Sequence, residues 1–303
     1  MNIKIGLNKI IVKEANMAKI AILGSNGQLG SDLIKVLTNA GHDVLPITRN
    51  EISAISTNLV NDLHQYLPNI DYVINCIAVT NVDGCEDNSL SAFQINADFV
   101  YYLAKYCSSN NIKLFQISTD YVFDGLKDIP YSEADNTHPL NIYGLSKLAG
   151  ELVVKAYLEK YFIFRVSSLF GIAGASGKGG NFVTTMQKLA IEKDSWTVIN
   201  DQITCPTHTL DIARAINAFI DKGVTEYGVY NCVSSNSCSW YQFTQEILNQ
   251  SGLDIGKVKP ISYKDYSFKA SRPKYGVLSV NKISKYYQMP TYQEALKEYL
   301  SLK

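Results

Sequence analysis

The chain has 303 residues, with 28 basic and 28 acidic side chains and a hydrophobic fraction of 46%. This length allows one large α/β domain or two unequal ones, and the balanced charge argues against nucleic acid or an anionic membrane as partner. Six scattered cysteines form no CxxC pair, which favours reduced thiols in a cytoplasmic protein. Residues 1–16 contain no apolar run of signal-peptide length. We therefore expect an N-terminal extension there that could be disordered.

Short apolar runs alternate with segments of helical spacing along the first 172 residues. Strands that alternate in this way with helices of about ten residues predict a parallel, doubly wound sheet. Strands are expected at 18–24, 42–49, 71–79, 112–119 and 161–171, and helices at 31–41, 61–67, 91–111 and 141–160. A ligand of such a sheet binds beyond the carboxyl ends of the strands.

After residue 172 the order becomes less regular. A glycine-rich loop over 174–181 is followed by expected helices at 181–193 and 209–220 and expected strands at 196–201 and 227–233. Ser239 with Gln242, and Thr291 with Glu294, have the spacing of capping boxes. We expect a nucleotide-binding domain over 17–172, with 207–235 returning to it. A smaller mixed α/β cap that binds substrate is expected over 173–206 and 236–303.

A glycine-rich turn follows the first expected strand. Its sequence, GSNGQLG, spans residues 24–30 and leads into the first helix. Glycines there permit a tight turn, and the helix N-terminus attracts a pyrophosphate. The spacing alone is a weak signal, but its place between strand and helix favours a dinucleotide over a turn without ligand. The candidate cofactor contacts are Gly24, Asn26, Gly27, Gln28 and Leu29, with Ala78 at the end of the strand over 71–79.

The end of the second strand bears on the choice of cofactor. Thr48 and Arg49 stand where an NAD-specific site usually has a carboxylate, and an arginine there can pair with a 2′-phosphate. NADP is therefore favoured over NAD. An arginine that simply faces solvent is the alternative.

Tyr143 and Lys147 lie four residues apart on an expected helix and so share one face. A neutral tyrosine can give its proton to an alkoxide, and a nearby ammonium is expected to lower the pKa of the phenol. Lysine can also bind the ribose of a nicotinamide nucleotide. Chance spacing on a surface helix is the alternative, but Thr119, at the end of the strand over 112–119, could bind the same carbonyl oxygen.

These segments together resemble the extended short-chain dehydrogenase/reductases, and within them the dTDP-4-dehydrorhamnose reductase group. The resemblance runs from about Met17 to the C-terminus and is carried by GSNGQLG, STDYVFDG, LNIYGLSKLAGE, FRVSSLFG, GNFV, INDQITCPT and SRP. It implies a Rossmann-type domain, a nicotinamide cofactor and a nucleotide-diphospho 4-keto-6-deoxysugar as substrate. It also implies catalytic roles for Thr119, Tyr143 and Lys147.

The resemblance further implies a set of substrate contacts. They are Asp120, Tyr121, Asn181, Gln202 and Arg272, the last facing a diphosphate. Similar dehydratases carry an Asp-Glu pair after the threonine, so Tyr121 favours simple reduction. The stretch that reads RTSW in many relatives is Arg165-Val166-Ser167-Ser168 here, which replaces an aromatic side chain that faces the sugar by a serine.

Two further expectations concern metals and assembly. Some relatives use magnesium at a dimer contact, but only Glu192 and Asp194 stand nearby in this chain, so no essential metal is expected. A homodimer is compatible with the resemblance. Two other functions share these motifs: a non-catalytic subunit similar to the regulatory subunit of methionine adenosyltransferase, and a sugar-nucleotide epimerase.

Overall fold

The computed structural model describes residues 17–174 and 180–303. The expected extension over 1–16 and most of the glycine-rich loop lie outside the described residues. The chain forms a central six-stranded sheet in which every pairing is parallel. Its strands, in spatial order, are β10 (Gly228–Asn231), β5 (Tyr161–Val166), β4 (Lys113–Thr119), β3 (Tyr72–Asn75), β1 (Lys19–Leu23) and β2 (Asp43–Ile47). This arrangement confirms the predicted doubly wound fold.

Helices cover both faces of the sheet, because alternate side chains of each buried strand point to opposite faces. Ile20 and Ile22 of β1 pack in the core beneath α1 (Gln28–Asn39) and α8 (Thr209–Asp221). Ala21 and Leu23 face the opposite core. That second core is covered by α2 (Leu59–Tyr66), α5 (Phe99–Ser109) and α6 (Ile142–Tyr157).

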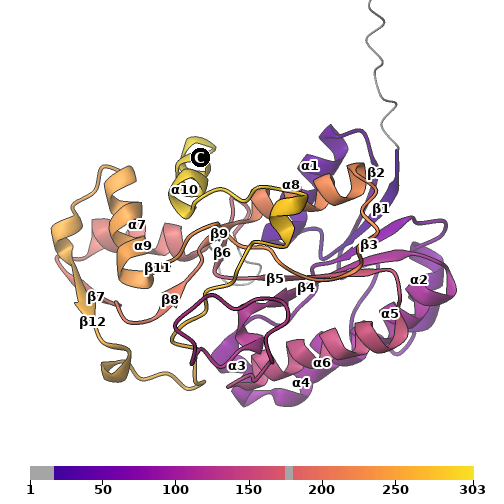
Figure 1. Ribbon diagram of the computed structural model, residues 1–303, viewed down its shortest axis with the longest axis horizontal. Helices are drawn as coiled ribbons and strands as arrows, with labels where there is room; N and C mark the ends of the chain where they lie inside the picture. The colour runs from indigo at the N-terminus through magenta and orange to yellow at the C-terminus, as the bar shows by residue number, and fades with distance from the viewer. Residues whose placement is uncertain (1–16, 175–179) are drawn as a thin grey trace, which may run out of the picture.

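A second, smaller body stands beyond the carboxyl ends of the strands. In Figure 1 it lies at one end of the long axis, and α2 and α5 lie at the other. Its helices are α7 (Phe182–Glu192), α9 (Trp240–Gln250) and α10 (Tyr292–Ser301), and its two-stranded pairs are β7 (Trp196–Ile199) with β12 (Val258–Ile261) and β8 (Ile203–Thr204) with β11 (Cys238–Ser239). Both predicted capping boxes are present, at the starts of α9 and α10.

Parts of the chain after residue 172 return to the central sheet or link it to the second body. The segment around β10 and α8 packs on the central sheet. A further pair, β6 (Leu169–Phe170) with β9 (Thr207–His208), links the bodies. Ile283 and Met289, in the range expected to belong to the cap, instead pack in the core beneath α8. The cap range therefore contains a segment that contributes to the sheet's own core.

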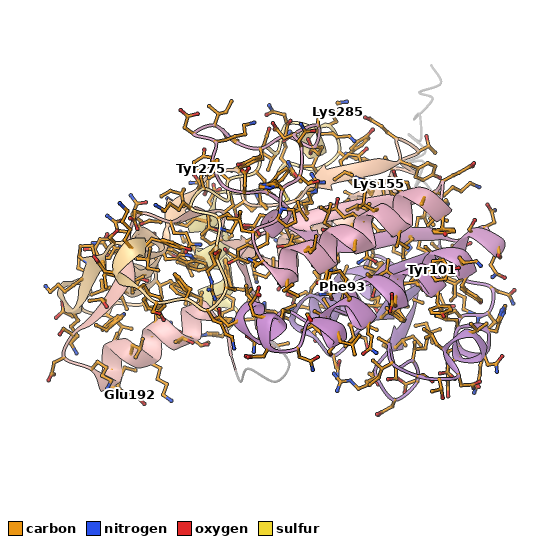
Figure 2. The ribbon with its side chains drawn as sticks, turned by 90° about the horizontal axis from the view of Figure 1, so that it is seen from below. Phe93, Tyr101, Lys155, Glu192, Tyr275 and Lys285 are labelled. Atoms are coloured by element: carbon orange, nitrogen blue, oxygen red, sulfur yellow. The ribbon has the colours of Figure 1, made fainter. Side chains whose placement is uncertain are left out.

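The long helix expected over 91–111 follows a different backbone path. The structure has α4 (Ser89–Phe93), a π-helical stretch at Gln94–Asp98 and then α5, preceded by a short α3 (Val82–Asp87) that the sequence pattern did not indicate. Figure 2 shows this helix, with Phe93 and Tyr101 labelled, alongside α6. The two approach closely at Gly150, where a Cβ would lie 2.3 Å from the carbonyl oxygen of Asn96.

A buried ion pair joins α6 to the sheet. Arg165 at the end of β5 donates from Nε and Nη2 to the Glu151 carboxylate, at 2.9 and 2.8 Å. Ser118 of β4 donates to the same carboxylate at 2.6 Å. All three side chains are buried. Although burial raises the pKa of Glu151, hydrogen bonds and charge from Arg165 and the Ser118 hydroxyl bring that pKa below its ordinary value. The carboxylate is therefore ionised at neutral pH.

Glu151→Ala should lower the free energy of unfolding by about 3–5 kcal/mol, because it leaves the Arg165 guanidinium buried without its partner. Denaturant titration would measure the change. Glu192→Ala is the matched control, since its exposed pair with Lys188 at 3.8 Å should contribute less than about 0.5 kcal/mol. Replacing both partners, in Glu151→Leu/Arg165→Met, should recover much of the loss. Equal effects of Glu151→Ala and Glu192→Ala would contradict this account.

Candidate active site

A cleft of about 610 Å³ opens at the carboxyl ends of the central strands, where the second body faces the sheet. Residues that follow β1, β3, β4 and β5 line it, together with β8, Trp240 of α9 and Pro273. Its position agrees with the rule that open α/β sheets bind ligands at this edge. Its volume suits a small organic ligand.

The glycine turn forms one end of the cleft. All five turn residues expected to contact a cofactor, and Ala78, line it. Gly24 has φ +75°, and a Cβ on Gly30 would lie 2.4 Å from the Gly24 carbonyl oxygen, so both positions require glycine. Helix α1 begins at Gln28, three residues earlier than expected, and has neither a capping side chain nor an acidic residue in its first turn. Its first N–H groups therefore suit an anion.

Arg49 lies at the edge of the same end of the cleft, and its side chain is exposed. The nearest carboxylate along the chain, Glu51, accepts hydrogen bonds from the backbone N and the Oγ1 of Thr48, at 2.8 and 2.6 Å. Those bonds lower the pKa of Glu51 and tie it to the turn. Arg49 thus stands at the cleft, and the carboxylate nearest to it in sequence is bound to Thr48.

Thr119, Tyr143 and Lys147 meet in the middle of the cleft. Thr119 ends β4, and the other two lie on one face of α6, as their spacing predicts. Lys147 reaches across to β4 and donates from Nζ to the carbonyl oxygen of Ile117 at 2.6 Å. The three residue types that the sequence singled out are therefore brought to one wall.

Close packing at the start of α6 places Tyr143. A Cβ on Gly144 would lie 2.2 Å from the carbonyl oxygen of Tyr121, so glycine lets the helix approach the turn after β4. Asn141 caps the helix by accepting from Gly144 N at 2.8 Å, and its Nδ2 donates to Ser271 O at 2.7 Å. The rings of Tyr121 and Tyr143 then meet edge to face, with centroids 5.6 Å apart.

Burial shifts the pKa values of the phenol and the ammonium on this wall in opposite directions, because it disfavours the charged form of each. It raises the pKa of Tyr143 well above its ordinary value, against a hydrogen bond from Thr119. It lowers the pKa of Lys147 to about 8, although the Glu151 carboxylate opposes that shift. The expected lowering of the phenol pKa by Lys147 is therefore not found, because removal from water raises that pKa and the Thr119 hydrogen bond is the one contact that lowers it. Tyr143 is neutral at pH 7 and carries a proton to donate.

The Asp120 carboxylate accepts hydrogen bonds from two hydroxyl groups. Its Oδ1 accepts from Thr119 at 3.1 Å and its Oδ2 accepts from Ser167 at 2.9 Å. Burial raises the pKa of Asp120 to about 6, and the bonds from Ser167 and Thr119 limit the rise. The carboxylate is thus mainly ionised at neutral pH and acts as an acceptor.

The other candidate substrate contacts divide into two groups. Tyr121 and Gln202 line the cleft, and Gln202 donates from Nε2 to Pro273 O at 3.1 Å. Asn181 instead forms the capping box of α7, with its Nδ2 donating to Gly171 O and to the Tyr299 hydroxyl. Arg272 is held by Asp83, with Nη2 2.8 Å from Oδ2, and lies over the Phe268 ring. Neither Asn181 nor Arg272 is among the residues that line the cleft, but Arg272 forms a hydrogen bond with Tyr121, which does line it.

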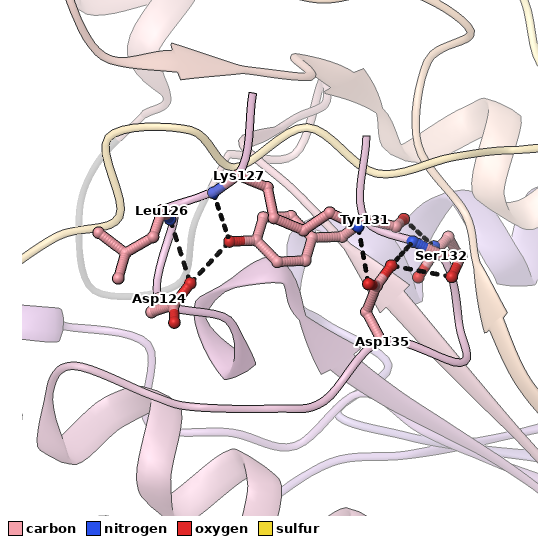
Figure 3. Close-up of polar contacts among 7 residues, drawn as sticks. Asp124, Leu126, Lys127, Tyr131, Ser132 and Asp135 are labelled. Atoms are coloured by element: carbon pink, nitrogen blue, oxygen red, sulfur yellow. Dashed lines mark hydrogen bonds and ion pairs between the residues drawn. The ribbon is translucent and has the colours of Figure 1, made fainter. Parts of the chain in front are cut away.

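The loop that follows STDYVFDG is fixed by its own polar contacts (Figure 3). Asp124 Oδ1 accepts from the Leu126 backbone N at 3.1 Å and from the Tyr131 hydroxyl at 2.7 Å. The Tyr131 ring in turn stacks on Phe123, with centroids 4.3 Å apart. Asp124 therefore fixes this turn, whereas Ser118, at the start of the same motif, binds the buried Glu151.

Asn96 is a residue that the sequence did not single out. Its side chain accepts from Val79 N at 3.0 Å, and its Nδ2 donates to Val79 O and to the Ser146 hydroxyl. It therefore joins the cleft-lining segment after β3 to α6. The π-helical stretch in which it lies is of a kind often found at functional sites. A lone asparagine within an apolar helical pattern was the only signal in the sequence.

The described residues, 17–174 and 180–303, hold neither a metal-binding cluster nor a helix suited to cross a membrane. No group of three or more histidine, cysteine, aspartate or glutamate side chains in this part of the chain could hold a metal ion. Within the same residues, no helix combines the length and apolar character needed to cross a membrane.

Comparisons with known proteins agree with this geometry. The family model described as the RmlD substrate binding domain matches residues 18–302. Spore coat polysaccharide biosynthesis protein SpsK of Bacillus subtilis is 36% identical over 286 residues, with 94% of this chain and 97% of that protein covered. A dTDP-4-dehydrorhamnose reductase of Aggregatibacter actinomycetemcomitans is 35% identical, with 93% and 98% covered.

Solved structures are similar along almost the whole chain. A dTDP-4-dehydrorhamnose reductase from Clostridium acetobutylicum has a TM-score of 0.86 at 38% identity, with 94% of this chain and 99% of that chain covered. One from Bacillus anthracis, in complex with NADP, has a TM-score of 0.87 at 34% identity, with 95% and 100% covered. The chain therefore belongs to the RmlD substrate-binding domain family, within the extended short-chain dehydrogenases/reductases.

Proposed function

We propose that the protein reduces the C4 keto group of a nucleotide-diphospho 4-keto-6-deoxysugar, with NADPH as the favoured reductant. The observation that carries this proposal is the meeting of Thr119, Tyr143 and Lys147 on one wall of the cleft that the glycine turn also lines. The relatives named dTDP-4-dehydrorhamnose reductase, one of them in complex with NADP, support both the reaction and the cofactor.

The residues present fit a dinucleotide. The open N-terminus of α1, the required glycines at 24 and 30 and the cationic Arg49 would face its phosphates. A bound reduced nicotinamide would supply the hydride. Lys147 would bind its ribose, since the Nζ stands at the carboxyl end of β4 with donors to spare beyond the Ile117 carbonyl.

The chain's own groups would then act on the carbonyl oxygen. Tyr143 is neutral and can donate its proton to that oxygen as negative charge develops there. The Thr119 hydroxyl would bind the same oxygen from β4 and stabilise the charge. Both hydroxyls would exchange their contact with each other for one to substrate.

The lining of the cleft favours reduction over dehydration. Asp120 is the only carboxylate among the described residues that line the cleft, and Tyr121 follows it. Burial, with the nearby Asp120 charge, raises the pKa of Tyr121, so this phenol stays protonated at neutral pH and is a poor base. Similar dehydratases have a second carboxylate directly after the aspartate, and this chain has Tyr121 at that position.

Tyr143→Phe should lower kcat by about a hundredfold or more, the usual contribution of a positioned proton donor, and leave the dissociation constant of NADPH nearly unchanged. Loss of NADPH absorbance on addition of a dTDP-4-keto-6-deoxysugar measures turnover. Tyr102→Phe, on the exposed side of α5, is the matched control. Turnover of Tyr143→Phe near that of the control would overturn the assignment. An unmodified protein that binds NADPH but oxidises none of it would favour the regulatory-subunit alternative.

Arg49→Ala should weaken NADPH binding by about tenfold or more, because a charged hydrogen bond to the 2′-phosphate would be lost. Binding of NADH, which lacks that phosphate, should change little. Fluorescence titration with both cofactors gives the two dissociation constants. An equal loss of affinity for NADPH and NADH would mean that Arg49 does not bind the 2′-phosphate.

The rate should fall as pH rises through about 8. The pKa of Lys147 is lowered to about 8, so the ammonium is present below that pH and is lost above it. A profile of kcat/KM between pH 6 and 10 would show this alkaline limb. Lys147→Arg should be slower at every pH but lack a limb near pH 8, because guanidinium stays charged. An unchanged limb in that variant would assign it to another group.

A further inference from the structure

A segment of the second body, residues 269–273, reaches back to the body that holds the central sheet. The chain enters this segment from β12 and leaves it at Tyr275, which forms an isolated parallel bridge with Ile203 of β8. Both ends are therefore held by the second body. Pro273, the last residue of the segment, lines the cleft and accepts from Gln202 Nε2 at 3.1 Å. We call residues 269–273 the strap.

The middle of the strap is bonded to α3. The Asp83 carboxylate accepts from both Nη atoms of Arg272, at 3.1 and 2.8 Å, and its Oδ1 also accepts from Ala270 N at 3.0 Å. Four residues later on the same helix, Asp87 pairs with Lys269. Figure 1 shows the chain that follows β12 running to α3. Two carboxylates of one short helix therefore hold a segment of the other body.

The start of α6 holds the strap as well. Asn141 caps this helix, and its Nδ2 donates to Ser271 O at 2.7 Å. Glu86 of α3 accepts from Ile142 N at 2.9 Å, so the two helices that hold the strap are bonded to each other. Tyr143 follows directly in the chain. The strap is thus bound at the helical turn that carries the proposed proton donor.

The pair of Asp83 and Arg272 is the strongest of these contacts. It is bidentate, the geometry in which a guanidinium and a carboxylate bind best. Only 14% of the Arg272 side chain is exposed, against 52% of Lys269, and a well-exposed pair contributes little. The hydrogen bond from Arg272 lowers the pKa of Asp83, so this carboxylate is ionised at neutral pH.

The Arg272 guanidinium is already engaged by the protein itself. Besides the bonds to Asp83, its Nη1 donates to Ala270 O at 3.0 Å, and its Cζ lies 4.0 Å from the centroid of the Phe268 ring. It also forms a hydrogen bond with Tyr121, which lines the cleft. A diphosphate would have to displace Asp83 from this guanidinium. The geometry therefore suits a residue that joins two parts of the protein.

We propose that the pair of Asp83 and Arg272 is a latch that holds the second body over the cleft and so retains a bound sugar nucleotide. The inference rests on the proposed function for the class of ligand. Arg272 is then a positioning residue, which acts through the strap and Tyr121, and not a ligand of the diphosphate. Opening of the latch would free the strap, and with it the wall at Pro273, for entry and release.

Single and double variants separate a latch from a direct diphosphate contact. Calorimetry on the NADP-saturated protein would measure the dissociation constant of dTDP-6-deoxyglucose. Asp83→Ala and Arg272→Ala should each weaken binding about fivefold or more, because each removes the whole bidentate pair. The double variant should bind within about twofold of either single variant, because both substitutions remove the same interaction.

Two controls accompany this cycle. The dissociation constant of NADP should stay nearly unchanged in every variant, whereas a general folding defect would weaken both ligands. Glu159→Ala, which removes an exposed carboxylate beyond the far end of α6, should bind like the unmodified protein. Unchanged or tighter sugar-nucleotide binding by Asp83→Ala, together with weaker binding by Arg272→Ala, would overturn the latch in favour of a direct diphosphate contact.

Hydrogen exchange of the ligand-free protein tests the latch without substrate. The Arg272 N–H donates to the Tyr263 hydroxyl at 3.1 Å and not to Asp83, so its exchange reports on the strap as a whole. Exchange over residues 266–274 should be about tenfold faster in Asp83→Ala and Arg272→Ala than in Glu159→Ala.

Equal exchange in all three variants would overturn the latch and leave the reductase proposal standing. Failure of the unmodified protein to bind dTDP-6-deoxyglucose, with the difference in exchange present, would instead overturn the substrate class and support the latch between the two bodies.

Discussion

The position of the cleft wall that holds Thr119, Tyr143 and Lys147 depends on the buried pair between Glu151 and Arg165. Glu151 lies four residues after Lys147 and eight after Tyr143, so the three share one face of α6. Its carboxylate is bound at once to Arg165 of β5 and to Ser118, the residue before Thr119. Because a buried charge cannot exchange its partners for water, these bonds fix how far α6 stands from the end of β4. The distance between Thr119 and Tyr143 follows from that constraint.

The same pair also resolves a conflict between burial and charge. A proton donor benefits from burial, which keeps Tyr143 neutral. The same burial lowers the pKa of Lys147 and so favours its neutral form, while the negative charge of Glu151 opposes that shift. Glu151 stays ionised because Arg165 and Ser118 compensate its own desolvation. A neutral phenol and an ammonium can therefore share one low-polarity wall near neutral pH.

The fold and the centre of the site could be predicted because both depend on short-range patterns. The buried strands read as apolar runs, and the glycine turn and the Tyr143–Lys147 spacing each lie within one local segment. The rest depends on contacts between distant segments. The pairing of Arg272 with Asp83 joins residues 189 apart, and Asn96 reaches both Val79 and α6. Neither contact has a local signature, so a diphosphate role for Arg272 was the only one that sequence suggested.

Asp120 connects Thr119 of the proposed site to the hydroxyl groups at the contact between the two bodies. One oxygen accepts from Thr119, which the proposed reaction places at the carbonyl, and the other accepts from Ser167, whose hydroxyl oxygen is 2.9 Å from that of Thr204. Ser167 follows β5 of the central sheet and Thr204 belongs to β8 of the second body, so this contact joins the two bodies beside Asp120. In the free protein Asp120 therefore holds Thr119, whose single proton would turn from the carboxylate to the carbonyl oxygen when substrate binds. The position of the Thr119 hydroxyl would then depend on the same buried carboxylate that contacts the junction of the two bodies.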